Sequence, residues 1–158
     1  MSIEVVRSYL KEYHLEQNIR EFEESSATVL LAAKAAGVIP ARIAKSLTFM
    51  AGDGPVMIIT CGDKKIDNHK YKERFLVKAK MLTPDEVVEY TGHEIGGVCP
   101  FALPKQSPIK VILDESLKRF DTIFPAAGSS NSCVEVTPEQ LFDSAGASEW
   151  QDLCKDIE

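Results

Sequence analysis

The fold is decided by a stretch that reads Leu47-Thr48-Phe49-Met50, then Gly52-Asp53-Gly54, then Pro55-Val56-Met57-Ile58-Ile59-Thr60-Cys61. Two runs rich in β-branched and apolar residues flank a glycine-containing turn, and this pattern predicts a β-hairpin. The first strand lies within residues 41–50, where period-two alternation places Lys45, Leu47 and Phe49 on one face. A lysine on such a face either keeps its charge in water at a rim or points into a pocket. The sequence leaves both alternatives open.

The rest of the pattern predicts more helices and strands without a strict βαβ alternation. Helices are expected at 2–15, from Ser25 or Ser26 to 36, at 67–75, 84–90 and 148–157, with a helical turn at 114–119. Thr83 with Glu86 predicts a capping box at the start of the helix at 84–90, and Thr137-Pro138 begins another helix with an acid or amide at the capping-box position. Short strands are expected at 19–22, 79–82, 109–113 and 133–136. The predicted class is α+β, a mixed and mostly antiparallel, barrel-like sheet with surrounding helices.

Length and composition favour one domain spanning residues 1–158. The chain is 44% hydrophobic and its net charge is −6, and a chain of this size can bury its own core. It has no run of 18 apolar residues and no charged leader, so we expect a cytoplasmic protein without a membrane partner. The four cysteines are widely spaced, which predicts reduced thiols and neither a zinc site nor a disulfide framework.

A glycine-rich loop at residues 92–101 is the first candidate site. Gly96 and Gly97 permit positive φ or close approach of a ligand, and Pro100 fixes the exit of the loop. Bare amides in such a loop can hold a carbonyl, carboxylate or phosphate oxygen. Cys99 is then either a wall of the pocket or a thiol nucleophile. The alternative is that the glycine pair forms only a turn.

Charge is distributed unevenly along the chain. Residues 62–80 carry a local surplus of +4, whereas residues 135–158 carry −6. Such polarity allows one face of an acidic protein to meet a polyanion, although a solvated helix face explains the charges equally well. The basic residues of this run are Lys64, Lys65, Lys70, Lys72, Arg74, Lys78 and Lys80.

Four motifs in order resemble one protein family. They are Lys45-Ser46-Leu47, Gly62-Asp63 before Asp67-Asn68, Gly96 through Phe101, and Gly128-Ser129-Ser130-Asn131 before Glu135 and Thr137-Pro138-Glu139. From about residue 22 to 141 the chain resembles the YbaK / prolyl-tRNA synthetase insertion-domain family of aminoacyl-tRNA deacylases. The resemblance implies a free-standing editing domain that removes a wrongly attached amino acid, most simply cysteine or alanine, from the tRNA for proline.

The same resemblance implies roles for individual residues, without a metal or organic cofactor. Its partners would be the acceptor end of tRNA and, further, prolyl-tRNA synthetase. Lys45 matches the functional lysine and Ser46 its hydroxyl neighbour, while Gly96 and Gly97 match the loop at the substrate carbonyl. The remaining candidate substrate contacts are Phe22, Cys99, Pro100, Gly128, Ser129, Ser130 and Asn131. The candidate contacts to the tRNA backbone are Lys64, Lys65, Lys70, Lys72 and Arg74.

The chain departs from the family pattern at three positions. Ser130 stands where a basic residue or histidine is frequent, Ala102 where glycine is common, and Cys99 where serine or threonine often occurs. The variation at the last position argues against an essential thiol nucleophile.

An aminoacyl ester is already activated, so a cation and loop amides that stabilise the oxyanion are sufficient chemistry. Lys45 would place a phosphate or the carbonyl, and the nucleophile would be water or the neighbouring hydroxyl of the terminal adenosine. Two alternatives remain: a non-catalytic regulator or adaptor that binds the aminoacyl-adenosine end, and a thiol hydrolase that pairs Cys99 with His93. The amino acid removed and the oligomeric state are left open.

Overall fold

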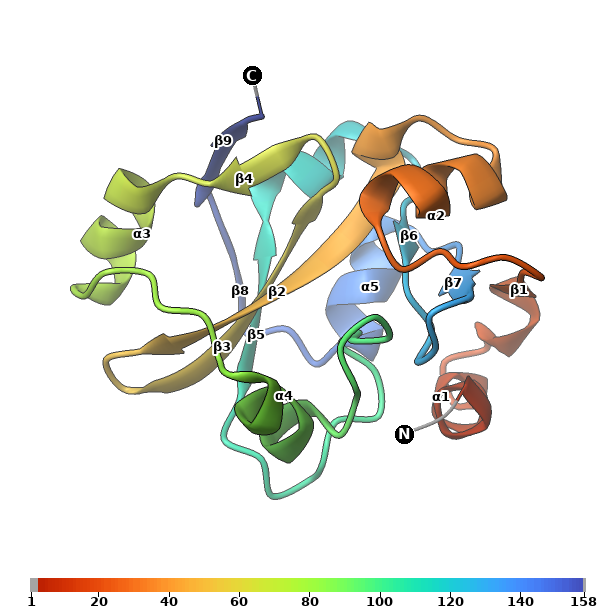
Figure 1. Ribbon diagram of the computed structural model, residues 1–158, viewed down its shortest axis with the longest axis horizontal. Coiled ribbons are helices and arrows are strands. Elements are labelled where there is room, and N and C mark those ends of the chain that lie inside the picture. Colours follow the sequence, from red (N-terminus) through yellow and green to blue (C-terminus); the bar gives the residue numbers. More distant parts are fainter. Residues whose placement is uncertain (1–2, 158) are drawn as a thin grey trace.

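The predicted hairpin is the centre of the fold. The computed structural model describes residues 3–157, and in it β2 (Ile43–Ala51) and β3 (Gly54–Cys61) pair antiparallel around the glycine turn. Figure 1 shows the two strands crossing the middle of the molecule. Met57, Ile58 and Ile59 are fully buried. A strand that is buried on both faces requires cover on both sides of the sheet.

The hairpin sits inside a five-stranded sheet of order β6-β2-β3-β5-β8. The added strands are β5 (Lys110–Asp114), β6 (Phe124–Pro125) and β8 (Glu149–Gln151), and each joins in parallel. Two small antiparallel sheets pair β1 (Ile19–Glu21) with β7 (Ser132–Val134) and β4 (Lys64–Ile66) with β9 (Cys154–Asp156). The α+β class and the mixed sheet are confirmed. Among residues 3–157 three strand pairs are antiparallel, including the long hairpin, and three are parallel, while the isolated bridges are antiparallel.

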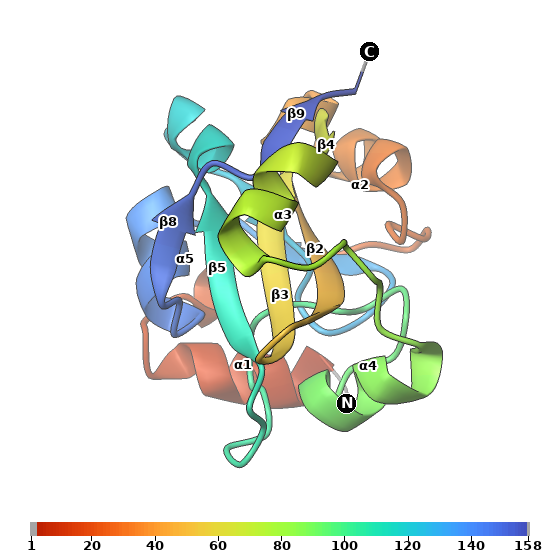
Figure 2. The ribbon, with the colours of Figure 1, turned by 90° about the vertical axis from the view of Figure 1, so that its left-hand side faces the viewer.

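Helices cover both faces of the sheet (Figure 2). Against one face pack α1 (Ile3–Lys11), α5 (Pro138–Ser144) and the glycine-rich loop, and against the other packs α3 (Asn68–Phe75). A third, smaller cluster places α2 (Val29–Ala36) over the start of β2. This last cluster matters for function because it forms one end of the pocket described below.

The helix starts follow local capping chemistry. Thr83 begins α4 (Pro84–Thr91) and Thr137 begins α5, each with a complete capping box as predicted. The cap of α2 is Thr28, which accepts from the Leu31 amide, so the expected cap at Ser25 or Ser26 is wrong. Helix α1 ends at Lys11, short of the predicted residue 15. Its predicted first residue, 2, lies outside the described part.

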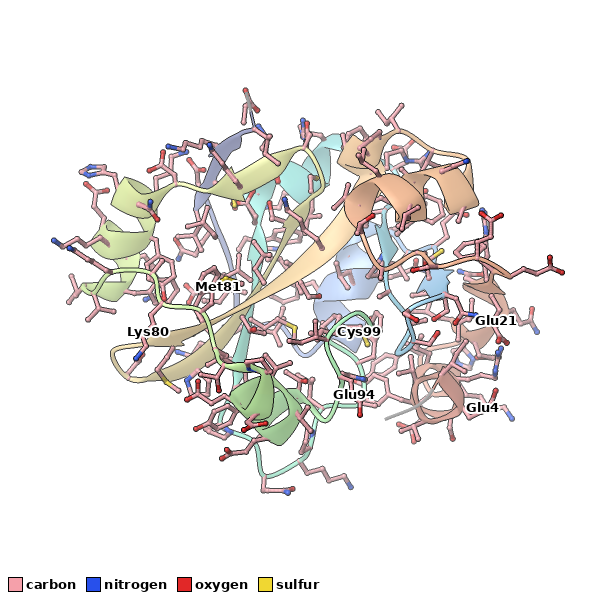
Figure 3. All side chains as sticks on the ribbon, in the orientation of Figure 1. Glu4, Glu21, Lys80, Met81, Glu94 and Cys99 are labelled. Atoms are coloured by element: carbon pink, nitrogen blue, oxygen red, sulfur yellow. The ribbon has the colours of Figure 1, made fainter. Side chains whose placement is uncertain are left out.

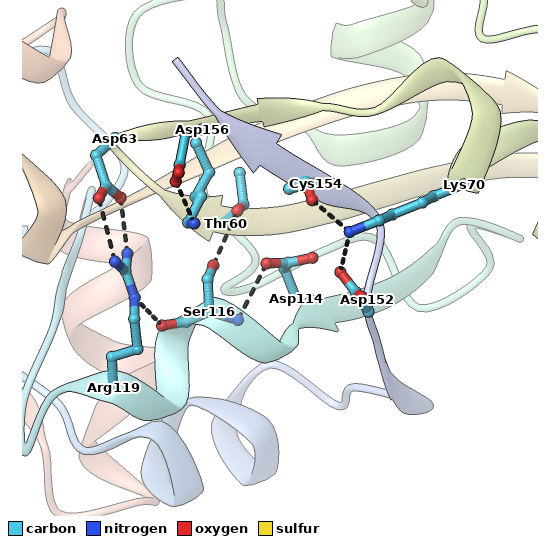
Figure 4. Close-up of polar contacts among 10 residues, drawn as sticks. Thr60, Asp63, Lys70, Asp114, Ser116, Arg119, Asp152, Cys154 and Asp156 are labelled. Carbon is cyan, nitrogen blue, oxygen red and sulfur yellow. Dashed lines mark hydrogen bonds and ion pairs between the residues drawn. The ribbon is translucent and has the colours of Figure 1, made fainter. Parts of the chain in front are cut away.

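The largest error in the sequence-based prediction concerns the C-terminal segment. A helix was expected at 148–157, whereas the structure has β8 and β9 there. The cause is a buried carboxylate: Asp114 accepts hydrogen bonds from the backbone amides of Leu153 at 2.9 Å and Ser116 at 3.0 Å. The bond to Leu153 holds the segment extended along the sheet. Figure 4 shows the contact of Asp114 with Ser116. The expected strand at 79–82 is reduced to one bridge between Phe49 and Met81.

Candidate functional site

A pocket of about 260 Å³ lies along the free edge of β2. Strand β6 pairs with this edge only at Ile43 and Ala44, and the next partner is the Leu82 amide, which donates to the Thr48 carbonyl at 3.2 Å. Between these points the edge has no strand partner among the described residues, so it opens onto the pocket. The lining includes residues 26–29, Ala32, residues 43–48, Met81, Leu82, Val87, Ile95, Gly96, Val98, Phe124, Ala126, Ser132 and Cys133.

Both ends of the pocket combine buried and exposed lining residues. At the β6 and α2 end, Phe124 is 3% exposed, whereas Ala27 and Thr28 are exposed. At the α4 end, Val87 is 4% exposed and Met81 is 62% exposed. Figure 3 labels Met81 beside β2.

Lys45 lines the pocket midway between the two ends. Its side chain is half-buried, and burial lowers the pKa of its ammonium group from the usual value. Among residues 3–157 no carboxylate forms an ion pair with it. Asp63 attracts the ammonium group without forming an ion pair with it. Such a partly desolvated cation can bind the oxygen of an anion or of a polarised carbonyl.

Of the expected glycine pair, Gly96 lines the pocket and Gly97 does not. Gly96 lines the pocket with φ +101°, and its N–H has no partner within the described chain. The Gly97 N–H is not bare, because it donates to the Glu94 carbonyl at 3.0 Å within a tight turn. A Cβ on Gly97 would lie 3.1 Å from backbone atoms of Ser129. Gly97 is thus the place where the two loops touch.

The second loop, residues 128–131, supports the segment that forms one wall of the pocket. The amide group of Asn131 donates to the Phe22 carbonyl at 2.8 Å, and the Ser26 N–H donates to the Ser130 carbonyl at 2.6 Å. These bonds hold the segment that supplies the lining residues 26–29. Ser129 is bonded within the same loop, to Ser132 at 2.6 Å. The predicted contacts at Phe22 and Gly128 through Asn131 are therefore brought to the site, but outside its lining.

Cys99 and Pro100 are buried and do not line the pocket. The Cys99 sulfur lies 3.4 Å from His93 Nε2, which donates to the Phe101 carbonyl at 2.7 Å. Burial raises the pKa of the Cys99 thiol to about 12 and lowers that of His93. The expected pocket wall at Cys99 is corrected to a core position, and a neutral, enclosed thiol does not suit a nucleophile.

The predicted tRNA-binding run is partly neutralised. Lys64 pairs with Asp156 at 2.5 Å and Lys70 with Asp152 at 2.9 Å (Figure 4). Arg74 pairs in the same way with Glu149. All three acids belong to the C-terminal segment. Lys65 and Lys72 are exposed and have no acidic partner among residues 3–157.

Four residues at or beside the β6 end of the pocket received no role from the sequence, although Glu135 stands in the fourth motif. Phe124 forms the wall, with the Arg20 and Arg42 guanidinium groups 5.3 and 5.2 Å from the centre of its ring. Glu135 bonds to Arg20 at 2.9 Å and lies 3.9 Å from Arg42. These residues are far apart in the sequence, and no spacing rule connects them. No group of three metal-binding side chains occurs within residues 3–157.

The comparison with protein families gives the class of protein to which this chain belongs. The model of the aminoacyl-tRNA editing domain matches residues 23–144, and the chain belongs to that family. It is similar to the uncharacterized protein YwhH of Bacillus subtilis, with 51% identity over all of both chains.

A proline–tRNA ligase of Thermotoga neapolitana is 30% identical over 118 residues, which are 74% of this chain and 19% of the ligase. The chain thus spans about a fifth of that ligase.

A solved structure supports the same assignment. A candidate trans-editing enzyme for prolyl tRNA synthetase has 29% identity and a TM-score of 0.85, over 97% of this chain and 96% of that one. No helix in the described part of the chain is long and apolar enough to cross a membrane.

Proposed function

We propose that this protein hydrolyses the aminoacyl ester of misacylated tRNA in trans, with cysteinyl- or alanyl-tRNA for proline as the substrate. One observation carries the proposal: Lys45 and Gly96, from distant parts of the chain, line the same pocket. Membership of the editing family and the similarity to proline–tRNA ligases support this class of substrate.

The pocket contains no carboxylate or imidazole among its described lining residues. We therefore assign proton transfer to the substrate. Water bonds to the ester carbonyl carbon while the Lys45 ammonium and the Gly96 N–H stabilise the oxyanion. The bond between that carbon and the ribose oxygen then breaks, and the proton of the water reaches the ribose oxygen through the neighbouring hydroxyl. The products are the free amino acid and tRNA with its terminal hydroxyl restored.

A second candidate is a non-catalytic binder of the aminoacyl-adenosine end, which regulates or recruits a synthetase. The observation that favours it is that the Gly97 N–H already donates to the Glu94 carbonyl. Fewer amides therefore remain to stabilise an oxyanion than the sequence predicted. Such a binder would retain a non-hydrolysable aminoacyl-adenosine without turnover.

The test is deacylation of alanyl-, cysteinyl- and prolyl-tRNA by the wild type and by Lys45→Ala. We expect the substitution to lower kcat by about 10²–10³, the effect of removing one oxyanion donor. Lys34→Ala is the matched control, because Lys34 is exposed on α2 and does not line the pocket. A Lys45→Ala rate close to that of the control would remove Lys45 from the mechanism.

A further inference from the structure

We propose that His93 is the positioning residue of the glycine-rich loop, residues 92–101. Its imidazole donates to the Phe101 carbonyl, closes the base of the loop and thereby holds Gly96 in the wall of the pocket. The inference rests on the proposed function only for the effect on the rate of deacylation, since it names what holds a residue that is assigned there to the oxyanion.

The entry of the loop is fixed to the last turn of α4. The Thr91 hydroxyl donates to the Val87 carbonyl at 2.6 Å and accepts from the His93 N–H at 3.0 Å. Thr91 is 0% and His93 is 1% exposed, so water does not compete for these bonds. The backbone of His93 is therefore anchored to the helix.

The side chain of His93 bonds to the exit of the loop. Its Nε2 lies 2.7 Å from the Phe101 carbonyl oxygen. Phe101 is fully buried, so this carbonyl needs a donor from the protein. The Cys99 sulfur (Figure 3) lies 4.0 Å from the same oxygen, and a thiol is a weak donor. The imidazole is therefore the group that satisfies this carbonyl and joins the two ends of the loop.

The same bond defines the protonation state of the ring. A carbonyl carries no hydrogen, so Nε2 holds the proton, and Nδ1 is bare in the neutral imidazole. Nδ1 is buried without a partner among the described residues, and burial lowers the pKa of His93. His93 does not line the pocket. We therefore assign the ring to positioning and not to proton transfer.

Gly96 lies between this closed base and a second fixed point. The Gly97 N–H donates to the Glu94 carbonyl at 3.0 Å, and a Cβ on Gly97 would lie 3.1 Å from backbone atoms of Ser129. This contact limits movement of the loop towards Ser129 but does not stop movement away from it. The bond of His93 supplies the missing restraint, so its loss should let Gly96 shift within the wall of the pocket.

Two substitutions separate the hydrogen bond from the other properties of the side chain. Gln in the variant His93→Gln is long enough to place an amide N–H near the position of Nε2, whereas Asn in His93→Asn is one methylene shorter and does not reach the Phe101 carbonyl. Both side chains are neutral amides, so the variants differ in the bond and share the loss of the ring. His69→Gln is the matched control, because His69 is exposed on α3 and does not line the pocket.

The first measurement is hydrogen exchange of the Gly97 amide, which is protected only while the loop keeps its turn. We expect exchange to become about tenfold faster in His93→Asn, the effect of one lost buried hydrogen bond on local opening. In His93→Gln it should stay within about threefold of the wild type. The NMR shifts of the two ring nitrogens of the wild type should show Nε2 protonated and Nδ1 bare.

The second measurement is deacylation of alanyl-tRNA for proline. We expect kcat to fall about tenfold in His93→Asn with KM changed less than about twofold, because an oxyanion donor acts in the transition state and not in the ground state. His93→Gln should recover most of this loss, and His69→Gln should keep the wild-type values.

The outcomes separate the two proposals. The inference is overturned by a folded His93→Asn variant with wild-type exchange at Gly97, by equal effects of Asn and Gln, or by a wild-type ring that carries its proton on Nδ1. Faster exchange with unchanged kcat overturns the link between the loop and the rate and leaves the proposed function standing. Faster exchange in a protein whose wild type does not deacylate tRNA supports His93 as the anchor of the loop and removes the hydrolase.

Discussion

Gly62 lies between the end of β3 and the pocket residue Val29, in a space too small for a side chain. It follows β3 directly, and its N–H donates to the Ile43 carbonyl at 2.8 Å. A Cβ at this position would lie 2.2 Å from the Pro40 carbonyl oxygen and 2.6 Å from Val29 Cγ1. Contacts that short are not found for real side chains, so Gly62→Ala must move the backbone around Pro40 or break the bond to Ile43.

The cost of Gly62→Ala can be estimated from this geometry. The neighbouring backbone has to retreat by roughly 1 Å, which places the substitution at the upper end of the 1–3 kcal/mol typical of overpacking. We expect a loss of about 3 kcal/mol in the free energy of unfolding. For a chain of this length, each kcal/mol lowers Tm by about 2–4 °C, so Tm should fall by about 6–12 °C.

The same displacement should reach the site. Val29 lines the pocket, so pushing it away from Gly62 distorts the wall of the pocket. We expect kcat/KM for deacylation to fall at a temperature where the variant is still folded. Urea denaturation and thermal unfolding give the stability, and deacylation of alanyl-tRNA for proline gives the activity.

Gly52→Ala is the matched control. Gly52 is exposed in the hairpin turn, and its Cβ would meet Val77 Cγ1 at an ordinary 3.5 Å. This substitution should change the free energy of unfolding by less than about 1 kcal/mol. A Gly62→Ala protein with the Tm and activity of Gly52→Ala would refute the close approach on which the reasoning depends.

Two further predictions concern the thiol and the basic run. Cys99→Ser should keep the deacylation rate within about twofold of the wild type. In the folded wild type the Cys99 thiol should resist alkylation at pH 8, because it is fully buried and its pKa is about 12. A folded Cys99→Ser variant without activity would restore the thiol hydrolase as an alternative. Lys65→Ala with Lys72→Ala should weaken tRNA binding and lower the salt slope of log K by about 2, whereas Lys64→Ala, which removes a paired lysine, should do less. Deacylation at subsaturating tRNA that is indifferent to salt would show that the run does not bind tRNA.

Local signals predicted the elements whose causes are local. The hairpin and the two capping boxes depend on residues within a few positions of each other, and all three are confirmed. Ala102, noted as standing where glycine is common, has φ +57°, the left-handed region that glycine enters without strain. The C-terminal strands could not be predicted, because the carboxylate of Asp114 that holds Leu153 comes from a distant strand.

In the candidate site, too, the residues with local sequence signals were predicted and those that depend on long-range contacts were not. Sequence motifs identified Lys45 and Gly96, which line the pocket. They also pointed to Gly97 and Cys99, whose hydrogen bonds and burial depend on loop geometry that a motif does not specify. Phe124 and its two arginine neighbours had no signal, since Arg20 and Arg42 come close to the ring only after folding brings the three together.

The charge blocks show how a sequence signal can change its meaning in the fold. The basic surplus at 62–80 and the acidic surplus at 135–158 suggested a face that meets a polyanion. In the structure three acids of this segment, Glu149, Asp152 and Asp156, pair with the basic run. All three lie beyond residue 144, where the family match ends. Because Lys64, Lys70 and Arg74 form ion pairs with acids of the same chain, they can bind a phosphate only if these pairs break. Any tRNA that engages this face must therefore rely on the remaining lysines or displace β9, and the comparison of Lys65 and Lys72 with Lys64 decides between these routes.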